Sequence, residues 1–185
     1  NSRRKGMVCV DDVERFFVDQ LDRWQQANEM YEDLKRVEVK SMDAGGCKVS
    51  VQFNPARIVS TGADVKASAI SERPCFLCGA NQPQEQKGLP LLGKYRLLVN
   101  PFPILPQHFT IPLYGHRPQR ILPYYADMME IVEGMGEKWM VFYNGAMCGA
   151  SAPDHMHLQA GSRGVVPLER DWDDVYSKQL KMIFC

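Results

Sequence analysis

The sequence has no excess of charge of either sign, because 22 Lys and Arg residues are balanced by 22 Asp and Glu residues. Long polyanions are bound through a cationic field, which a neutral chain does not provide. The sequence also has no apolar run near the roughly 20 residues that a bilayer span requires, and no apolar stretch follows the polar start NSRRKG. We therefore expect a cytoplasmic protein with a small partner, and neither a nucleic acid polymer nor a membrane as its target.

The six cysteines are scattered, and only one pair lies close together in the sequence. A chain of 185 residues can bury about 70% of its unfolded surface, so it does not need disulfides for stability. A reducing compartment and one domain over residues 1–185 are the simpler expectation. The six cysteines are Cys9, Cys47, Cys75, Cys78, Cys148 and Cys185.

Two segments have apolar residues at helical spacing. The first runs from Asp11 to Arg36 and predicts a long amphipathic helix within an N-terminal extension of residues 1–40. The second runs from Leu122 to Met140 and predicts a helix that lies across a sheet. The last stretch, residues 171–185, ends on apolar residues without a stop signal, which leaves open a docked C-terminal helix or a chain cut short.

Alternating or short apolar segments predict the strands. KVSVQF (48–53) alternates as a half-buried strand does, and YRLLVN (95–100) and HFTIPL (108–113) resemble an antiparallel pair joined by a proline-rich connector. VFYNG (141–145) and HMHLQAG (155–161) predict two more strands, the last of them an inner one. Residues 54–90 are predicted to be irregular. Strands, a helix and strands again indicate an α+β fold, not alternating βαβ units.

Residues 141–161 contain the residues best suited to chemistry. If HMHLQ is extended, its period of two places His155, His157 and Gln159 on one face. Before them comes a small-residue loop that can aim backbone N–H groups at phosphate oxygens. The alternative is a polar edge strand beside an ordinary turn. Two of the four histidines lie in this motif, which favours a site. The loop residues are Asn144, Gly145, Gly149 and Ser151.

This pattern, N-G-x-x-x-G-x-S-x-P-x-H-x-H-x-Q, resembles the signature of the histidine triad (HIT-like) superfamily in its transferase branch. That branch includes galactose-1-phosphate uridylyltransferase, the diadenosine tetraphosphate phosphorylases and the plant GDP-galactose phosphorylases. The resemblance covers roughly residues 50 to 165. It implies an antiparallel sheet with packed helices, His157 as nucleophile, Gln159 as a phosphate contact, and a phosphate grip by Asn144, Gly149 and Ser151.

The chemistry of these residue types agrees with that implication. A neutral imidazole is a good nucleophile, and attack on an α-phosphorus would split one difficult transfer into two easier steps. Its second nitrogen must be held by an acceptor so that the tautomer is fixed. Glutamine can donate to phosphate but cannot titrate near neutrality, which favours transfer over hydrolysis.

Cys75 and Cys78 form a Cys-x-x-Cys pair whose spacing suits two ligands of one zinc ion. A redox dithiol or two buried cysteines are the alternatives, although a thioredoxin-like βαβ pattern is missing. The segment resembles the zinc segment of the uridylyltransferases, which implies His116 and His155 as the other ligands. His108 competes with His116 for that role, but we expect it to be structural.

Asn100 and Phe102 lie where the resembled family holds its nucleoside, with a rigid proline turn as the alternative. Arg57 is a further phosphate-binding candidate, with a solvated surface arginine as its alternative. Asp154, which immediately precedes His155, either supports a zinc ligand or caps a turn.

Together these features predict a nucleotidyltransferase or phosphorylase with a structural zinc. It would pass a nucleoside monophosphate from an NDP-sugar or a dinucleoside polyphosphate, through His157, to phosphate or a sugar phosphate. A zinc-stabilised nucleotide-binding module without catalysis and a dinucleoside polyphosphate hydrolase are the alternatives. The base, the acceptor and the oligomeric state, a homodimer included, are left open.

Overall fold

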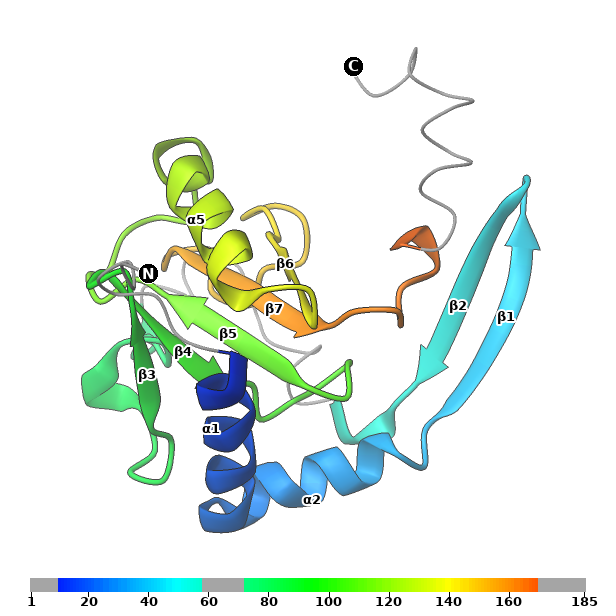
Figure 1. The fold of residues 1–185 in the computed structure, drawn as a ribbon, viewed down its shortest axis with the longest axis horizontal. Coiled ribbons are helices and arrows are strands. Elements are labelled where there is room, and N and C mark those ends of the chain that lie inside the picture. Colours follow the sequence, from blue (N-terminus) through cyan, green and yellow to red (C-terminus); the bar gives the residue numbers. More distant parts are fainter. Residues whose placement is uncertain (1–9, 58–71, 170–185) are drawn as a thin grey trace.

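The computed structural model describes residues 10–57 and 72–169. Its largest element is a five-stranded antiparallel sheet in the order β3-β4-β5-β7-β6 (Figure 1). The predicted pair of strands joined by the proline-rich connector is confirmed as β4 and β5, and the predicted inner strand is confirmed as β7. The strands are β3 (Gly88–Leu91), β4 (Tyr95–Val99), β5 (His108–Pro112), β6 (Trp139–Phe142) and β7 (His157–Ser162).

The two faces of this sheet differ in character because side chains alternate along each strand. On one face Phe109 and Ile111 of β5 lie opposite Ala160 and Leu158 of β7, and all four are buried in the hydrophobic core. The other face carries the intervening residues, among them His157, Gln159 and Thr110. The sheet therefore separates a dry core from a face with polar groups.

Three helices of the described ranges cover the core face. They are α1 (Val10–Arg23), α2 (Gln25–Leu34) and α5 (Tyr125–Met135), and each contributes residues to the hydrophobic core. Phe17 of α1 makes edge-on contacts with Tyr31 of α2 at 5.0 Å and with Phe109 of β5 at 5.7 Å between ring centroids. Helices packed on an antiparallel sheet confirm the predicted α+β class.

The single long helix predicted for residues 11–36 is wrong, because the chain turns at Trp24, which has φ −123° and ψ 86°. A continuous helix of that length would be about 39 Å long. A six-residue strand of the sheet is only about 20 Å long, so such a helix would extend beyond the sheet on which it packs. The turn lets both halves pack on the sheet, and it buries the Trp24 side chain to 4% exposure.

The predicted helix over residues 122–140 is shorter than expected. It begins as the 3-10 helix η3 (Leu122–Tyr124) and α5 ends at Met135, because Gly136 adopts a φ of 74° that stops the helix. Trp139 therefore lies in β6 and not in the helix. Two further 3-10 helices are η1 (Pro55–Arg57) and η2 (Gly79–Asn81), and β3 is an unpredicted strand in the segment expected to be irregular.

The strand predicted at residues 48–53 exists as β2 (Cys47–Phe53), but its half-buried position in the main sheet is wrong. Within the described part of the chain it pairs with β1 (Glu38–Ala44) alone, and the resulting hairpin projects away from the main sheet (Figure 1). Val51 and Phe53 are 49% and 69% exposed. Alternation identifies a strand with two different faces but does not say what covers either of them.

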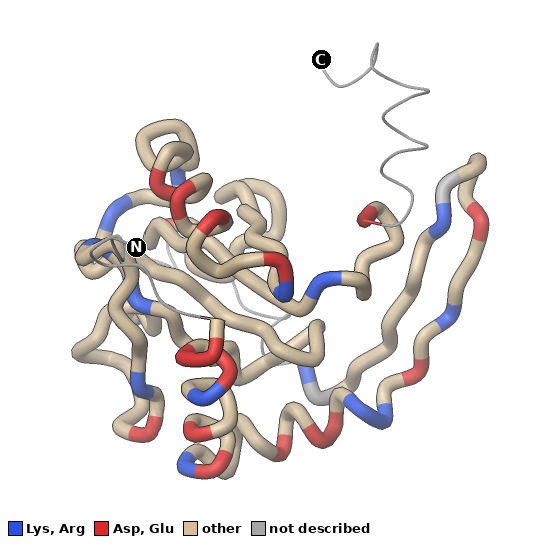
Figure 2. Tube along the Cα trace, viewed as in Figure 1, with Lys and Arg blue, Asp and Glu red and all other residues tan. Residues whose placement is uncertain are grey.

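Charged residues of both signs are interspersed along α1, α2 and the hairpin (Figure 2), in keeping with the balanced composition. Among residues 10–57 and 72–169, we find no helix long and apolar enough to cross a membrane. The stretch 171–185, for which a docked helix or an interrupted chain was considered, lies outside the described residues.

Candidate functional site

A cavity of about 400 Å³ lies against the polar face of the sheet. It brings together five of the predicted site residues: His157, Gln159, Ser151, Asn100 and Phe102. A larger cavity of about 510 Å³ has mostly apolar walls, such as Leu105 and Val166, and includes none of them. The smaller cavity is therefore the candidate site. Its other walls include Trp24, Gln26, Arg73, Phe76, Leu77, Gln86, Leu98 and Thr110.

His157 is the first residue of β7 and is 6% exposed, with its side chain in the cavity wall. Its Nδ1 lies 2.8 Å from the carbonyl oxygen of His155. Because a carbonyl only accepts, Nδ1 carries the hydrogen and Nε2 keeps a lone pair. Burial lowers the pKa of His157, while the bond to His155 works against that shift. The ring is therefore neutral at pH 7, with a nucleophilic Nε2.

Gln159 follows on the same face of β7, and its Oε1 lies 2.8 Å from Nε2 of His108. The backbone N–H of Ile104 donates to the other ring nitrogen of His108 over 3.3 Å. Nδ1 of His108 is thus an acceptor, so its Nε2 carries the hydrogen and donates to Gln159. This bond turns the oxygen of the Gln159 amide toward His108 and leaves its NH₂ group as the donor for an anion in the cavity.

His108 itself is 1% exposed and lies beside β7, outside the group of metal-ligand side chains. Burial lowers its pKa to about 4, with a further lowering by the nearby charge of Arg57, while the bond to Gln159 opposes the shift. His108 is therefore neutral at physiological pH, which preserves its role as donor to Gln159.

We expect the His108 shift to appear as pH-dependent stability. Because the folded pKa of about 4 lies below the ordinary value of 6.5, the stabilisation is complete above pH 6.5 and is lost as the pH falls toward 4. The full difference is about 3 kcal/mol in the free energy of unfolding. Urea unfolding between pH 4.5 and 7.5 measures it, and His108→Gln should show the flatter profile. Parallel profiles for both proteins would contradict the assignment.

The loop between β6 and β7 contributes unequally to the cavity. Ser151 lines it, whereas Asn144, Gly145 and Gly149 are not among the lining residues. Gly149 has a φ of 89°, a conformation that glycine adopts without strain. The loop therefore reaches the cavity with its C-terminal part.

The predicted nucleoside residues lie on the turn after β4. The side-chain oxygen of Asn100 accepts the N–H of Phe102 at 2.9 Å, and its amide donates to Thr110 at 3.2 Å. Asn100 thus shapes the turn that places Phe102 in the cavity wall. Arg57, the other predicted anion contact, is not in that wall and lies near His108.

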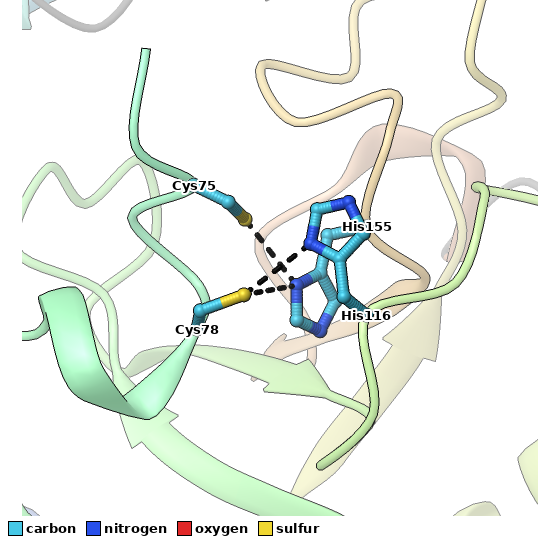
Figure 3. A group of neighbouring side chains, drawn as sticks. All are labelled: Cys75, Cys78, His116 and His155. Carbon is cyan, nitrogen blue, oxygen red and sulfur yellow. Dashed lines mark hydrogen bonds between the residues drawn. The ribbon is translucent and has the colours of Figure 1, made fainter. Parts of the chain in front are cut away.

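Four side chains predicted as metal ligands converge beside the cavity: Cys75, Cys78, His116 and His155 (Figure 3). Their ligand atoms all lie within 4.8 Å of one another. The Cys75 Sγ to His155 Nδ1 and Cys78 Sγ to His116 Nδ1 distances are both 3.3 Å. A tetrahedral zinc with ordinary bond lengths puts sulfur and nitrogen about 3.6 Å apart. The donor set therefore fits zinc in type and spacing.

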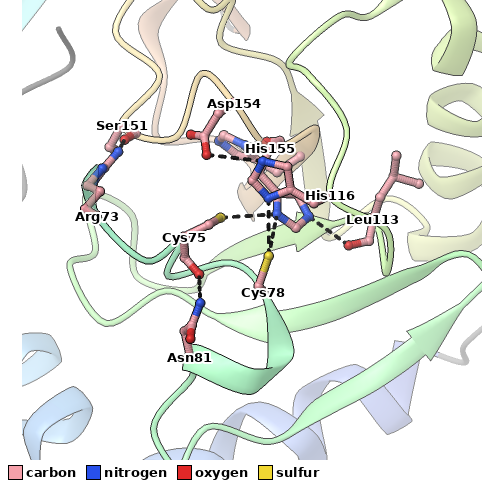
Figure 4. Close-up of polar contacts among 10 residues, drawn as sticks. Arg73, Cys75, Cys78, Asn81, Leu113, His116, Ser151, Asp154 and His155 are labelled. Carbon is pink, nitrogen blue, oxygen red and sulfur yellow. Dashed lines mark hydrogen bonds and ion pairs between the residues drawn. The ribbon is translucent and has the colours of Figure 1, made fainter. Parts of the chain in front are cut away.

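The surroundings of this cluster suit a metal as well. Asp154 lies 3.4 Å from Nε2 of His116, and the carbonyl of Leu113 lies 3.0 Å from Nε2 of His155 (Figure 4). Acceptors on the outer nitrogens leave both Nδ1 atoms for the ion. Of the two roles considered for Asp154, the contact to His116 fits support of a ligand. Burial raises the pKa of the Cys75 thiol to about 11, so a neighbouring cation is needed to hold this side chain as a thiolate.

His155 does not share the cavity wall with His157 and Gln159, contrary to the period-two prediction. The strand β7 begins at His157, so His155 precedes it and turns its ring to the cysteines. Its carbonyl nevertheless holds the His157 ring. One residue thus belongs to the metal cluster through its side chain and to the cavity through its main chain.

Sequence reasoning missed several residues of the site. Arg73 donates to the carbonyl of Ser151 at 2.6 Å (Figure 4). Its guanidinium lies 5.2 Å from the ring centre of Phe76. Arg73 lies two residues before the Cys-x-x-Cys motif and Phe76 lies within it, and this proximity was the available signal. Trp24 and Gln119 gave none, since a helical apolar residue and a lone glutamine are ordinary features.

The sequence is 27% identical over 124 residues to diadenosine 5',5'''-P1,P4-tetraphosphate phosphorylase 2 of Saccharomyces cerevisiae, covering 59% of this chain and 37% of the yeast protein. This distant homology confirms the resemblance to the phosphorylases of the histidine triad superfamily.

Among solved structures, yeast Ap4A phosphorylase Apa2 in complex with Ap4A matches with a TM-score of 0.45 and 20% identity, over 84% of this chain and 55% of that one. Apa2 alone matches with a TM-score of 0.40 and 18% identity, over 74% and 48%. The chain thus spans between 37% and 55% of the lengths of these relatives. Residues 16–162 match the family described as "Domain of unknown function (DUF4922)", and the chain belongs to that family.

Proposed function

We propose that this protein is a dinucleoside polyphosphate phosphorylase that works through a nucleotidyl-histidine on His157. The observation that carries the proposal is the neutral His157 ring, with Nδ1 bonded to the His155 carbonyl over 2.8 Å, in a cavity shared with Gln159 and Ser151. The similarity to a yeast diadenosine tetraphosphate phosphorylase supports the choice of substrate class.

In the first step Nε2 of His157 attacks the phosphorus atom next to one of the two nucleosides, which is the α-phosphorus of that nucleotide unit. The new N–P bond replaces the bridging P–O bond, and a dinucleoside tetraphosphate then loses a nucleoside triphosphate as the leaving group. The Nδ1–H bond to the His155 carbonyl supports the ring as it becomes positively charged. No proton has to leave the imidazole before attack, because Nε2 already holds the lone pair.

In the second step an oxygen of inorganic phosphate attacks the same phosphorus. The N–P bond breaks, a nucleoside diphosphate leaves, and His157 returns to its neutral form. Phosphate is already an anionic nucleophile at pH 7, so it needs no general base, whereas water would. Gln159 cannot act as a base, which favours phosphorolysis over hydrolysis.

The cavity offers groups for both ends of a nucleotide. We assign the NH₂ of Gln159 as a donor to the reacting phosphoryl group, and the bond from His108 to the amide oxygen at 2.8 Å supports this assignment. Arg73 brings a positive charge to the same cavity and is bonded to Ser151. The rings of Phe76 and Phe102 suit contact with a base. These groups suit a nucleotide, and they do not identify which base it carries.

The metal cluster is assigned a structural role. Zinc held by Cys75, Cys78, His116 and His155 would crosslink three segments of the chain beside the cavity. His155 connects that crosslink to the ring of His157 through its carbonyl. The groups that react with the substrate are side chains of the protein, and the zinc has no part in the two chemical steps.

The test is phosphorolysis with labelled inorganic phosphate. With diadenosine tetraphosphate we expect the label in ADP and unlabelled ATP in equal amount. Without phosphate we expect one ATP per protein and an AMP adduct by intact mass. NDP-sugars with phosphate or a sugar phosphate serve as the competing donors. AMP binding without adduct or product from any donor would indicate a binding module instead, and ATP release in water without phosphate dependence would indicate a hydrolase.

A further inference from the structure

Gln119 lies between the predicted phosphate loop and the first residue of β7, and it is 3% exposed. Its Oε1 accepts the backbone N–H of His157 at 2.8 Å, and its Nε2 donates to the carbonyl of His157 at 3.0 Å. The same Nε2 donates to the carbonyl of Asn144 at 2.8 Å. One carboxamide therefore binds both peptide groups of His157 and the start of the loop.

The strands cannot make these bonds themselves. On one side His157 is opposite Pro112 of β5, but the backbone N–H and carbonyl of His157 do not face that strand. Ser162 donates to the carbonyl of Gln107 on the β5 side, and Arg163 donates to the carbonyl of Lys138 on the β6 side. This alternation turns the backbone groups of His157 toward β6. On the other side β6 ends at Phe142, which is paired with Gln159, so the same register continued by two residues would set Asn144 opposite His157. The strands have separated there, and the Gln119 carboxamide fills the interval as an added rung of the ladder.

The main chain of Gln119 extends the same connection. Its backbone N–H donates to the carbonyl of Pro153 at 3.1 Å, near the end of the loop. Gln119 also follows the predicted metal ligand His116 by three residues. It thus contacts the loop at two points, Asn144 and Pro153, and the predicted nucleophile at both of its peptide groups.

We propose that Gln119 is a positioning residue that sets the distance and angle between the His157 ring and the phosphoryl group held by the loop. The proposal rests on the nucleotidyl-transfer function proposed above. With the carboxamide removed, both the backbone N–H and the carbonyl of His157 lose their partner, and the ring shifts relative to Ser151. A misplacement of about 1 Å at a reacting centre costs about 10²-fold in rate.

The experiment compares Gln119→Leu and Gln119→Glu with the wild type in single-turnover adduct formation at saturating diadenosine tetraphosphate. We expect about a 10²-fold slower adduct rate constant for Gln119→Leu, with the Kd for AMP within about threefold. A residue that only supported folding would lower the active fraction and leave the rate constant of the folded molecules unchanged. Adduct formation by Gln119→Leu at the wild-type rate overturns the proposal.

Gln119→Glu adds a readout that a general loss of stability would not produce. An ionised carboxyl accepts from the His157 N–H but sets an anionic oxygen against the carbonyls of His157 and Asn144. A protonated carboxyl has one O–H and so donates to one of these two carbonyls, which removes the negative charge and restores part of the carboxamide's bonding. We expect the adduct rate of Gln119→Glu, divided by that of the wild type, to rise by up to about tenfold for each unit by which the pH falls from 8 to 6. A ratio independent of pH overturns the proposal, and this arm also decides it if Gln119→Leu does not fold.

A measurement without turnover separates this inference from the proposed function. ¹⁵N spectra of the His157 ring report which nitrogen is protonated, and hydrogen exchange reports the protection of its backbone amide. We expect Gln119→Leu to lose amide protection and to mix the two tautomers. If the wild type forms no adduct, the function is wrong and these spectra alone decide the role of Gln119. Spectra and exchange identical to the wild type overturn it.

Discussion

Replacing His157 with alanine should abolish adduct formation from diadenosine tetraphosphate, with a loss of phosphorolysis on the order of 10⁴-fold or more. The reason is that no other described side chain in the cavity wall combines a ring nitrogen that keeps its lone pair with a second nitrogen held by a carbonyl. In His157 the His155 carbonyl holds Nδ1 and so fixes the tautomer. Binding should survive, because the nucleotide is held by the remaining walls. The measurements are intact mass for the adduct and equilibrium binding of AMP.

Chemical rescue provides the control for this prediction. His157→Gly leaves room for free imidazole, which should accept the nucleotidyl group and restore ATP release in proportion to its concentration. Arg15→Ala, which removes only an exposed ion pair with Asp12, should react as the wild type does. An alanine variant that still forms the adduct would move the nucleophile elsewhere. A variant that no longer binds AMP would show that His157 contributes to ground-state binding of the nucleotide.

Replacing Cys78 with serine should release the metal and destabilise the protein strongly. Cys78 Sγ lies 3.3 Å from Nδ1 of His116 and 3.6 Å from Nδ1 of His155, so it is next to both histidines. At free zinc about a thousandfold above its Kd, bound zinc contributes about 4 kcal/mol to the free energy of unfolding. For a chain of this size that corresponds to a fall in Tm of about 8–16 °C.

The zinc content of the purified protein and its thermal unfolding check this prediction. Cys148→Ser is the matched control, because Cys148 is an exposed cysteine outside the cluster and its loss should leave both values unchanged. The adduct rate should fall together with the metal, since the His155 carbonyl holds the His157 ring. One zinc per chain retained by Cys78→Ser would remove Cys78 from the ligand set, and no zinc in the wild type would remove the metal altogether.

The secondary structure followed the sequence where one face of a segment is buried. β4, β5 and β7 were predicted as strands and lie together in the main sheet. The hairpin strand β2 was recognised as a strand but was wrongly expected to be half-buried, because the alternation of Val49, Val51 and Phe53 is the same whether the apolar face is covered or exposed. The break at Trp24 was also missed, since a helical period continues through it.

The sequence by itself determined the kinds of chemistry available: two thiols at metal-ligand spacing, a histidine with a glutamine two residues on, and a small-residue loop before them. These are local patterns, so residue type and spacing are enough to find them. Only the tertiary structure shows what the four histidines contact, because most of these hydrogen-bond partners come from distant segments. Leu113 and the cysteines orient His155, and Gln159 orients His108. A lone glutamine, Gln119, joins the loop to His157 for the same reason: its partners lie 25 and 38 residues away in the chain.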